Sequence, residues 1–551
     1  MSNTARRYIS VFLQAGLLLI IWVASVSASP GNGSGVPTPD PFTEELIDRM
    51  EANGFQVTQG FPVLYTIEDC IHYTYPALKN CFGANPAAPY VIPVVKLWPD
   101  EYLDPAQVDS IMDTNTGSTT MYRLDPREAI VIYGLMPPPG RYMGLQTWQF
   151  SEHARWKTKD YNQWADEPDL AFPMQYLFDT LPPDDPKSQR VISLTSLGDV
   201  VNNAFMENES GYPFGEIRYF IITPSAATDE AIRHMLQDQG VADGHIFTEE
   251  IPGWDDYGPI GPLGMGKNAI DFFTAFRYAV PNPGYELDAQ AWRANPPLTV
   301  LRVRAPSSLG PAQRYTSLVY EPRAGKGNSE AYLAGDLDNL VAAVCNTLTS
   351  QTNLTTTDCT LPPPETTYIP ELIRAYGWTG PYCRSIDMDC QADQQEAALY
   401  FSSPRLLGDE QVLAVIGTLA TETGNATYVA LSANDASMFA GVANVLDSDV
   451  FIAPSTHLKG LKGSADSFAA TVNNTGLFFV HYFAKNCTLL DSNPVAAANC
   501  SPVEAADPMQ GDPALRDMYM IGLRDYIAPG TQRGPDPALL LTPRLLMFTL
   551  P

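Results

Sequence analysis

Histidine and basic side chains are both scarce in this chain of 551 residues. A Ser-His-Asp triad needs one of only six histidines, which narrows the search for a catalytic base. The 33 lysines and arginines face 62 aspartates and glutamates, so the formal net charge is −29. An acidic protein of this kind repels the phosphate backbone, and we therefore expect no nucleic-acid partner.

The linear signatures of several enzyme classes are missing as well. The sequence contains no G-x-S-x-G elbow, no G-x-x-x-x-G-K-[ST] phosphate loop, no H-E-x-x-H zinc helix and no C-x-x-C-H haem motif. Asp387, Asp389, Asp393 and Glu396 have a spacing that suits Ca²⁺, but the glycine and full ligand set of an EF-hand are absent. We expect no metal and no cofactor, while a site assembled from distant residues stays open.

Long apolar runs are confined to the N-terminus. Arg6 and Arg7 precede an apolar stretch at 11–26, and Ala28 ends a small-residue motif that predicts a signal peptide, residues 1–28. No other window approaches the ~20 apolar residues of a membrane span, so we predict no span after signal removal. The predicted location is secreted or periplasmic. Cleavage would remove two arginines and no acids, which makes the mature chain still more acidic.

Eight cysteines support the same compartment. An even number of cysteines in an exported chain predicts disulfides. None shows the C-x-x-C spacing of a redox or zinc site, and short loops close at little entropic cost. The simplest pairing is therefore local: Cys70–Cys81, Cys345–Cys359, Cys383–Cys390 and Cys487–Cys500.

The 48 prolines and 39 glycines indicate many turns and short elements. We predict a β-rich α+β fold with two domains of mostly antiparallel sheet, sandwich- or barrel-like, with a few short helices. One β-α-β-like unit is expected at 216–251, where a strand, an amphipathic helix and a second strand follow one another. The predicted divisions are a tether at 29–39, an N-terminal domain at 40–254, a Gly/Pro linker at 255–268 and a C-terminal domain at 269–551.

A local concentration of basic residues stands out at 119–160. Every second position from 153 to 159 is basic: His153, Arg155, Lys157 and Lys159. On a strand this spacing places all four side chains on one face. Trp148 lies close by, and aromatic rings beside arginines suit anionic or sugar-like ligands. The alternative is a solvated face on an outer strand, where lysines discourage edge pairing.

A second basic segment lies at 454–464. It combines His457, Lys459 and Lys462 with several hydroxyl groups, a set that suits a carboxylate, phosphate or sulfate. The alternative is that the lysines balance the nearby Asp447, Asp449 and Asp466. His481 lies in an apolar run, where a buried, neutral histidine satisfied by a backbone carbonyl is a simpler interpretation than catalysis.

Two functions from different classes fit these observations. The first is a hydrolase that acts on an anionic or polyhydroxylated substrate, small or polymeric, with His153 or His457 as general base. The second is a non-catalytic secreted binding or surface-associated protein. In the first, substrate would be held by Arg141, Trp148, Arg155, Lys157, Lys459 and Lys462.

Overall fold

The computed structural model describes residues 38–102, 117–153, 190–251, 263–310, 315, 323–356, 359, 396–453, 456–507, 511 and 515–551, except 79, 84, 86, 198, 199 and 268. The predicted signal peptide and nearly all of the predicted tether lie outside these residues. Within them the protein is a β-rich α+β fold of mostly antiparallel sheets with few helices, as the sequence predicts.

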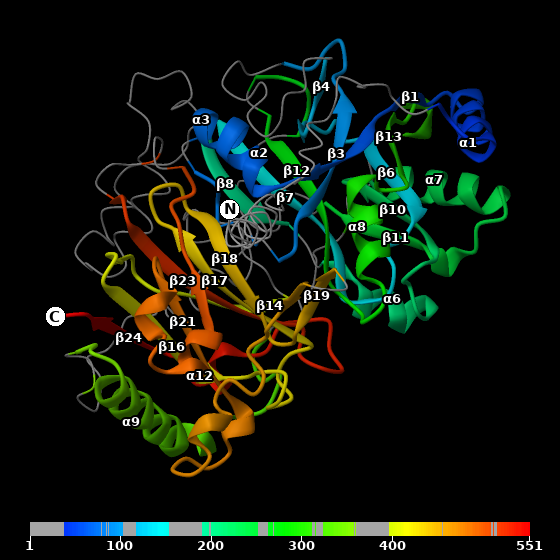
Figure 1. Cartoon of the computed structure of the whole chain (residues 1–551). Coiled ribbons are helices and arrows are strands. Elements are labelled where there is room, and N and C mark those ends of the chain that lie inside the picture. The colour runs from blue at the N-terminus through cyan, green and yellow to red at the C-terminus, as the bar shows by residue number, and fades with distance from the viewer. Residues whose placement is uncertain are drawn as a thin grey trace, which may run out of the picture. The chain divides into compact units, whose positions relative to one another are not determined.

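The first sheet contains the predicted β-α-β unit. Strands β10 and β11 run parallel and are joined by helix α7, Ala226–Asp238, which begins at the N-cap Ser225. Helix α1, Pro41–Ala52, begins at the N-cap Asp40 and packs with α7 on the outer face of this sheet (Figure 1). The strand order is β1 (Gln56–Gln59), β13 (Leu298–Arg304), β6 (Glu128–Leu135), β10 (Ile217–Thr223) and β11 (Ile246–Glu250).

The second sheet packs its apolar side on the inner face of the first sheet. On β12, Phe272, Phe276 and Tyr278 point to that shared core, because alternate residues of a strand share a face. The main order is β2 (Phe61–Tyr65), β3 (Tyr90–Lys96), β12 (Asp271–Pro281), β7 (Gly140–His153) and β8 (Arg190–Ser196). Three short strands join it: β4 (Ser118–Thr119), β5 (Met121–Tyr122) and β9 (Val201–Asn202).

The C-terminal residues form two further sheets that pack as a sandwich. The third sheet runs β14 (Ala397–Phe401), β23 (Met518–Tyr526), β17 (Tyr428–Asp435) and β18 (Ala440–Leu446), with β15 (Arg405–Leu406) beside β23. The fourth runs β22 (Cys500–Pro502), β21 (Phe478–Ala484), β16 (Gln411–Thr418) and β24 (Arg544–Thr549). A separate hairpin pairs β19 (Val450–Ala453) with β20 (Thr456–Leu458).

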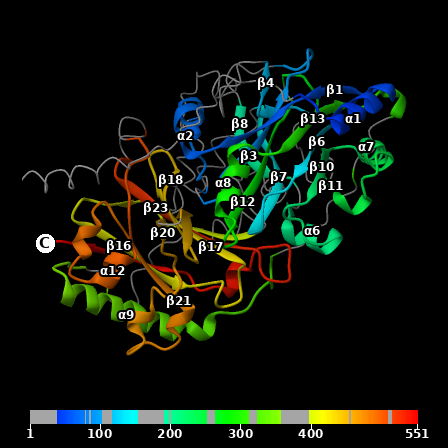
Figure 2. The same cartoon turned by 45° about the vertical axis from the view of Figure 1, so that its right-hand side comes forward.

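Helices are few and lie outside the sheets. Helix α9, Ala334–Gln351, buries its apolar side against the outer face of the fourth sheet (Figure 2). The others are α2 (Ile67–Asp69), a π-helical turn (Cys70–Thr74), α3 (Tyr75–Leu78), α6 (Asn203–Ser210), α8 (Glu286–Ala294) and α12 (Pro494–Ala498). In the part of the chain that the structure describes, no helix is long and apolar enough to cross a membrane.

Sheet pairing does not follow two breaks in the sequence, the turn at 136–140 and the Gly/Pro stretch at 255–268. Strands β6 and β7 flank the turn but lie in different sheets, so the turn carries the chain from one layer to the next. Strands β12 and β13 follow the Gly/Pro stretch and pair with β7 and β6, which precede it. The first two sheets therefore take strands from both sides of this stretch, up to residue 304, and the last two begin at residue 397.

A buried polar layer lies where the second sheet meets the third. The strand alternation that points Phe276 to one core points Ala275, Arg277 and Ala279 to the opposite side. There they meet Tyr428 and other residues of the third sheet, which face back toward them. This layer places charged groups deep in the protein and adjoins the pocket described below.

Glu249 gives the protein a defined pH dependence. The side chain of this buried residue lies between the first two sheets and accepts hydrogen bonds from the amide and hydroxyl of Thr147. Burial raises the pKa of Glu249 from 4.5 to about 8, so the folded state keeps a proton that the unfolded chain loses above pH 4.5. Stability from this group is therefore lost as the pH rises toward 8.

We expect Glu249→Gln to flatten the fall in unfolding free energy between about pH 5 and about pH 8, because the amide has no proton to lose. Urea unfolding at the two pH values measures this. Glu230→Gln is the control, since Glu230 is an exposed glutamate on α7. An unchanged pH dependence in Glu249→Gln would show that another group causes the decline.

Candidate functional site

The two predicted catalytic histidines are described only through their backbones. His153 pairs with Arg190 at the end of β7, and His457 pairs with Phe451 in the β19–β20 hairpin. Their side chains, and the whole of Arg155 and Lys157, lie outside the described residues. Their predicted roles as base and anion holders therefore stay predictions.

The structure brings Arg141 to the second basic segment. Its guanidinium donates to Asp447 and to Ser448, and the backbone amide of Lys462 donates to the carbonyl of Asp447. The Lys462 ammonium pairs with a different acid, Glu422. Lys459 is exposed. Arg141 and Lys462 thus meet around one aspartate and are paired with acids.

Two other predicted residues lie in the interior. Trp148 is only 3% exposed and stacks beneath the guanidinium of Arg277, 5.6 Å from the ring centre. His481 is buried, and its Nε2 lies 3.0 Å from the hydroxyl of Ser501. Burial, with Lys459 nearby, lowers the pKa of His481 to about 3, so it is neutral at physiological pH. His481 is therefore buried and neutral as predicted, but its partner is a side-chain hydroxyl and not a backbone carbonyl.

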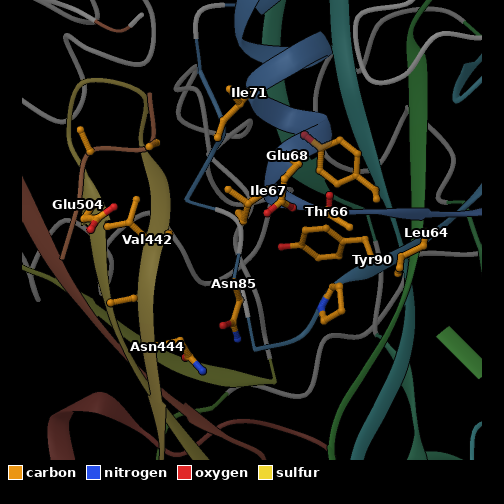
Figure 3. A pocket seen from close by; sticks show the side chains of 16 residues that line it. Leu64, Thr66, Ile67, Glu68, Ile71, Asn85, Tyr90, Val442, Asn444 and Glu504 are labelled. Carbon is orange, nitrogen blue, oxygen red and sulfur yellow. The ribbon is translucent and has the colours of Figure 1, made fainter. Parts of the chain in front are cut away.

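A pocket of about 560 Å³ opens between the second and third sheets. One wall comes from β2, the turn into α2, the π-helical turn and the start of β3, and the other from the edge strand β18 and residues 504–506. Figure 3 shows the two walls facing each other, with Glu504 and Val442 on one and Glu68 and Tyr90 on the other. This volume lies in the usual range for sites of small molecules.

The pocket combines exposed carboxylates with buried amides. Glu68 and Glu504 are exposed, and no histidine, lysine or arginine is among the described residues that line the pocket. Asn85 is 4% exposed; its Oδ1 accepts from the Ala87 amide, but its buried Nδ2 has no partner among the described residues. The buried Oδ1 of Asn444 likewise has none. The pocket therefore offers an unused donor, an unused acceptor and two acidic groups.

Local sequence explains how the first wall is built. The Thr66 hydroxyl accepts from the Asp69 amide and the Asp69 carboxylate accepts from the Thr66 amide, a capping box that starts the helical turn carrying Glu68. The disulfide Cys70–Cys81 then ties this turn to the following segment. That segment is held to the third sheet, because the Cys81 amide donates to the carbonyl of Met438.

Three of the predicted disulfides are present: Cys70–Cys81, Cys345–Cys359 and Cys487–Cys500. Cys383 and Cys390 lie outside the described residues. Disulfides persist in oxidising compartments, so the three bonds indicate that the chain folds in one.

We expect the Cys70→Ser/Cys81→Ser pair to destabilise the protein and to weaken any ligand bound in the pocket. For a loop of roughly a dozen residues the loss is about 3 kcal/mol. The Cys345→Ser/Cys359→Ser pair is the matched control, because its loop is similar in length and it anchors α9, which contributes no residue to the pocket walls. Urea unfolding should show similar losses for both pairs, with ligand affinity changed only in the first; equal affinity changes would contradict the role of this disulfide in the wall.

The comparisons with known proteins add little. No family model matches this chain. No curated protein matches it either. Among solved structures, it is similar to an uncharacterized protein from Burkholderia cenocepacia, with 9% identity over 94% of this chain and 91% of the other and a TM-score of 0.31. A protein from Vibrio parahaemolyticus gives 11% identity over 78% and 87%, also with a TM-score of 0.31. Likeness at this level carries no argument about fold or function.

The sequence did not single out the pocket residues. Glu68, Asn85, Asn444 and Glu504 come from segments far apart in the chain and form no linear motif. The Thr66-x-x-Asp69 capping box was the one readable local signal, and it locates a helix start without indicating a ligand. Glu396, from the weak Ca²⁺ spacing, pairs instead with Arg277, and no group of three metal-ligating side chains occurs among the described residues.

Proposed function

We propose that this protein is an exported, disulfide-stapled binding protein that holds a small polyhydroxylated molecule, such as a mono- or disaccharide, in the pocket between β3 and β18. The observation that carries the proposal is a pair of buried amide atoms at the pocket, Asn85 Nδ2 and Asn444 Oδ1, for which the described residues provide no partner. Buried polar atoms are normally hydrogen-bonded, so unpaired ones at a pocket favour a polar ligand.

Hydroxyl groups match this lining better than other ligand groups do. A hydroxyl both donates and accepts, so it can bind the donor of Asn85 or the acceptor of Asn444. The carboxylates of Glu68 and Glu504 accept from further hydroxyls. The apolar side chains of Leu64, Ile67, Ile71 and Val442 supply contact for the carbon–hydrogen faces of a sugar ring.

Export is part of the same proposal. The three disulfides support an oxidising compartment, and the N-terminal signal motif supports delivery to it. We propose that the mature protein begins at Ser29 and is secreted or periplasmic. N-terminal sequencing of the protein recovered outside the cytoplasm tests this, and an uncut N-terminus would contradict it.

A saccharide panel tests the binding function directly. We expect at least one mono- or disaccharide to raise the melting temperature and to bind in isothermal titration. Asn444→Ala should weaken that binding roughly 5- to 100-fold, since an unpaired polar group costs about 1–3 kcal/mol. Asn346→Ala, an exposed position on α9, is the control and should bind normally. Failure of the whole panel to bind would overturn the proposal.

Hydrolysis is the second candidate, because two carboxylates line opposite walls of the pocket. A glycosidase needs such a pair, one residue as acid and the other as base or nucleophile. This version dispenses with the predicted histidine base, which is not among the described lining residues. Release of nitrophenol from a panel of nitrophenyl glycosides, lost in Glu68→Gln and Glu504→Gln, would favour hydrolysis over binding alone.

A further inference from the structure

Two buried arginines lie behind the pocket wall at Tyr90. Tyr90 of β3 and Arg277 of β12 are directly paired across the second sheet, so their side chains share the face that looks toward the third sheet. Arg524 of β23 lies on the facing side of that layer. Burial raises the pKa of the Tyr90 hydroxyl, while both guanidinium groups lower it, which shows that both act on the same hydroxyl.

Positive charge exceeds negative charge around that hydroxyl. Arg277 pairs with the fully buried Glu396, which also accepts from Tyr142. Arg524 donates to the Ser432 hydroxyl and the Gly83 carbonyl, and it forms no ion pair among the described residues. Burial lowers the pKa of Arg524, but a guanidinium keeps its proton at physiological pH. Within the described part of the chain, one buried cation is therefore left without an anion.

Unused donors gather around Arg277. Gln146 accepts from Arg277 through its Oε1, which leaves its own amide nitrogen beside the guanidinium, and the indole of Trp148 lies beneath it. Four buried donor atoms in this group have no partner among the residues that the structure describes: Arg277 Nε, Arg277 Nη1, Gln146 Nε2 and Trp148 Nε1. All of these are N–H groups, so the missing partners are acceptor oxygens.

We infer that the layer behind Tyr90 is an inner subsite for a carboxylate, and that the ligand of the pocket is a sugar acid. The inference rests on the proposed function, because the hydroxyls of the ligand occupy the outer pocket at Asn85 and Asn444. The carboxylate reaches past Tyr90, supplies the anion that Arg524 lacks and accepts from the donors around Arg277. Tyr90 lines the pocket and stands between it and the two arginines, so the proposal requires its ring to turn aside when the carboxylate enters.

Matched pairs of sugars test this subsite on the unaltered protein. Galacturonate should bind at least about tenfold tighter than galactose, and glucuronate tighter than glucose, in isothermal titration near neutral pH. The methyl ester of galacturonate keeps the shape and the carbonyl but loses the charge, so it should bind like galactose. The preference for the acid should decrease as salt is added, because salt screens the attraction between the carboxylate and the arginines wherever solvent reaches the path.

Substitution of Arg524 tests whether its positive charge is the one that binds the carboxylate of the ligand. Arg524→Gln should remove the preference for galacturonate while galactose still binds, and Arg516→Gln, at an exposed arginine outside the pocket, should change neither. Equal affinity for acid, ester and neutral sugar in the unaltered protein would overturn the subsite and leave the binding function standing. No binding of any sugar would overturn the proposed function and the subsite with it.

Discussion

Replacing Glu396 by alanine should lower the free energy of unfolding by about 3–5 kcal/mol, the largest single-residue loss of stability expected in this protein. Glu396 is fully buried and accepts hydrogen bonds from Arg277, Tyr142 and Asn202. Alanine leaves the guanidinium of Arg277 charged, buried and unpaired, because its pKa is too high for it to lose its proton. Urea unfolding followed by circular dichroism measures the loss.

Two comparisons separate this effect from a general loss of packing. Lys462→Gln removes a surface ion pair whose lysine side chain is 63% exposed, and it should cost at most about 1 kcal/mol. The double variant Arg277→Met/Glu396→Leu removes both charges and should be more stable than Glu396→Ala alone. If Glu396→Ala lowers the free energy of unfolding by no more than Lys462→Gln does, our account of the buried layer is wrong.

Filling the pocket should abolish most ligand binding without harming the fold. Ala505 lines the pocket from the loop after β22 and is partly exposed, so a tryptophan there extends into the cavity. Overfilling a site costs about 1–3 kcal/mol, which corresponds to a loss of affinity of roughly 5- to 100-fold. Titration with the tightest sugar of the panel measures it.

The control for this variant introduces the same ring elsewhere. Leu287 is 65% exposed on α8 and does not line the pocket, so Leu287→Trp should bind like the unaltered protein. Both variants should unfold at similar urea concentrations. Normal affinity in Ala505→Trp would mean that the ligand binds at another place on the protein.

Local sequence patterns predict individual helices and strands better than they predict which strands pair in a sheet. The β-α-β unit and three of the four short-range disulfides depend on residues close in sequence, and the structure contains them. The pairing of β6 and β7 with strands of two different sheets depends on contacts across the whole chain. A turn motif such as 136–140 fixes the break between two strands and does not determine whether they pair.

The candidate site escaped prediction for a related reason. Arg277 lies in an apolar strand, where the sequence indicates burial and gives no sign of the carboxylate that pairs with it more than a hundred residues later. The basic residues that looked anomalous are partly accounted for by acids, as Arg141 with Asp447 shows. Trp148 was selected for its proximity to arginine, and its actual partner is Arg277 of the neighbouring strand. Only the fold assigns such partners.

The most direct test of the central claim is a crystal structure of the protein with galacturonate. We predict sugar density in the pocket between β3 and β18, with hydroxyls at Asn85 and Asn444 and the carboxylate directed past Tyr90 toward Arg524. Galactose should occupy the same outer positions without reaching the arginines. Density for the sugar only at another surface, such as the segment at 456–464, or an empty pocket at saturating sugar, would contradict the account.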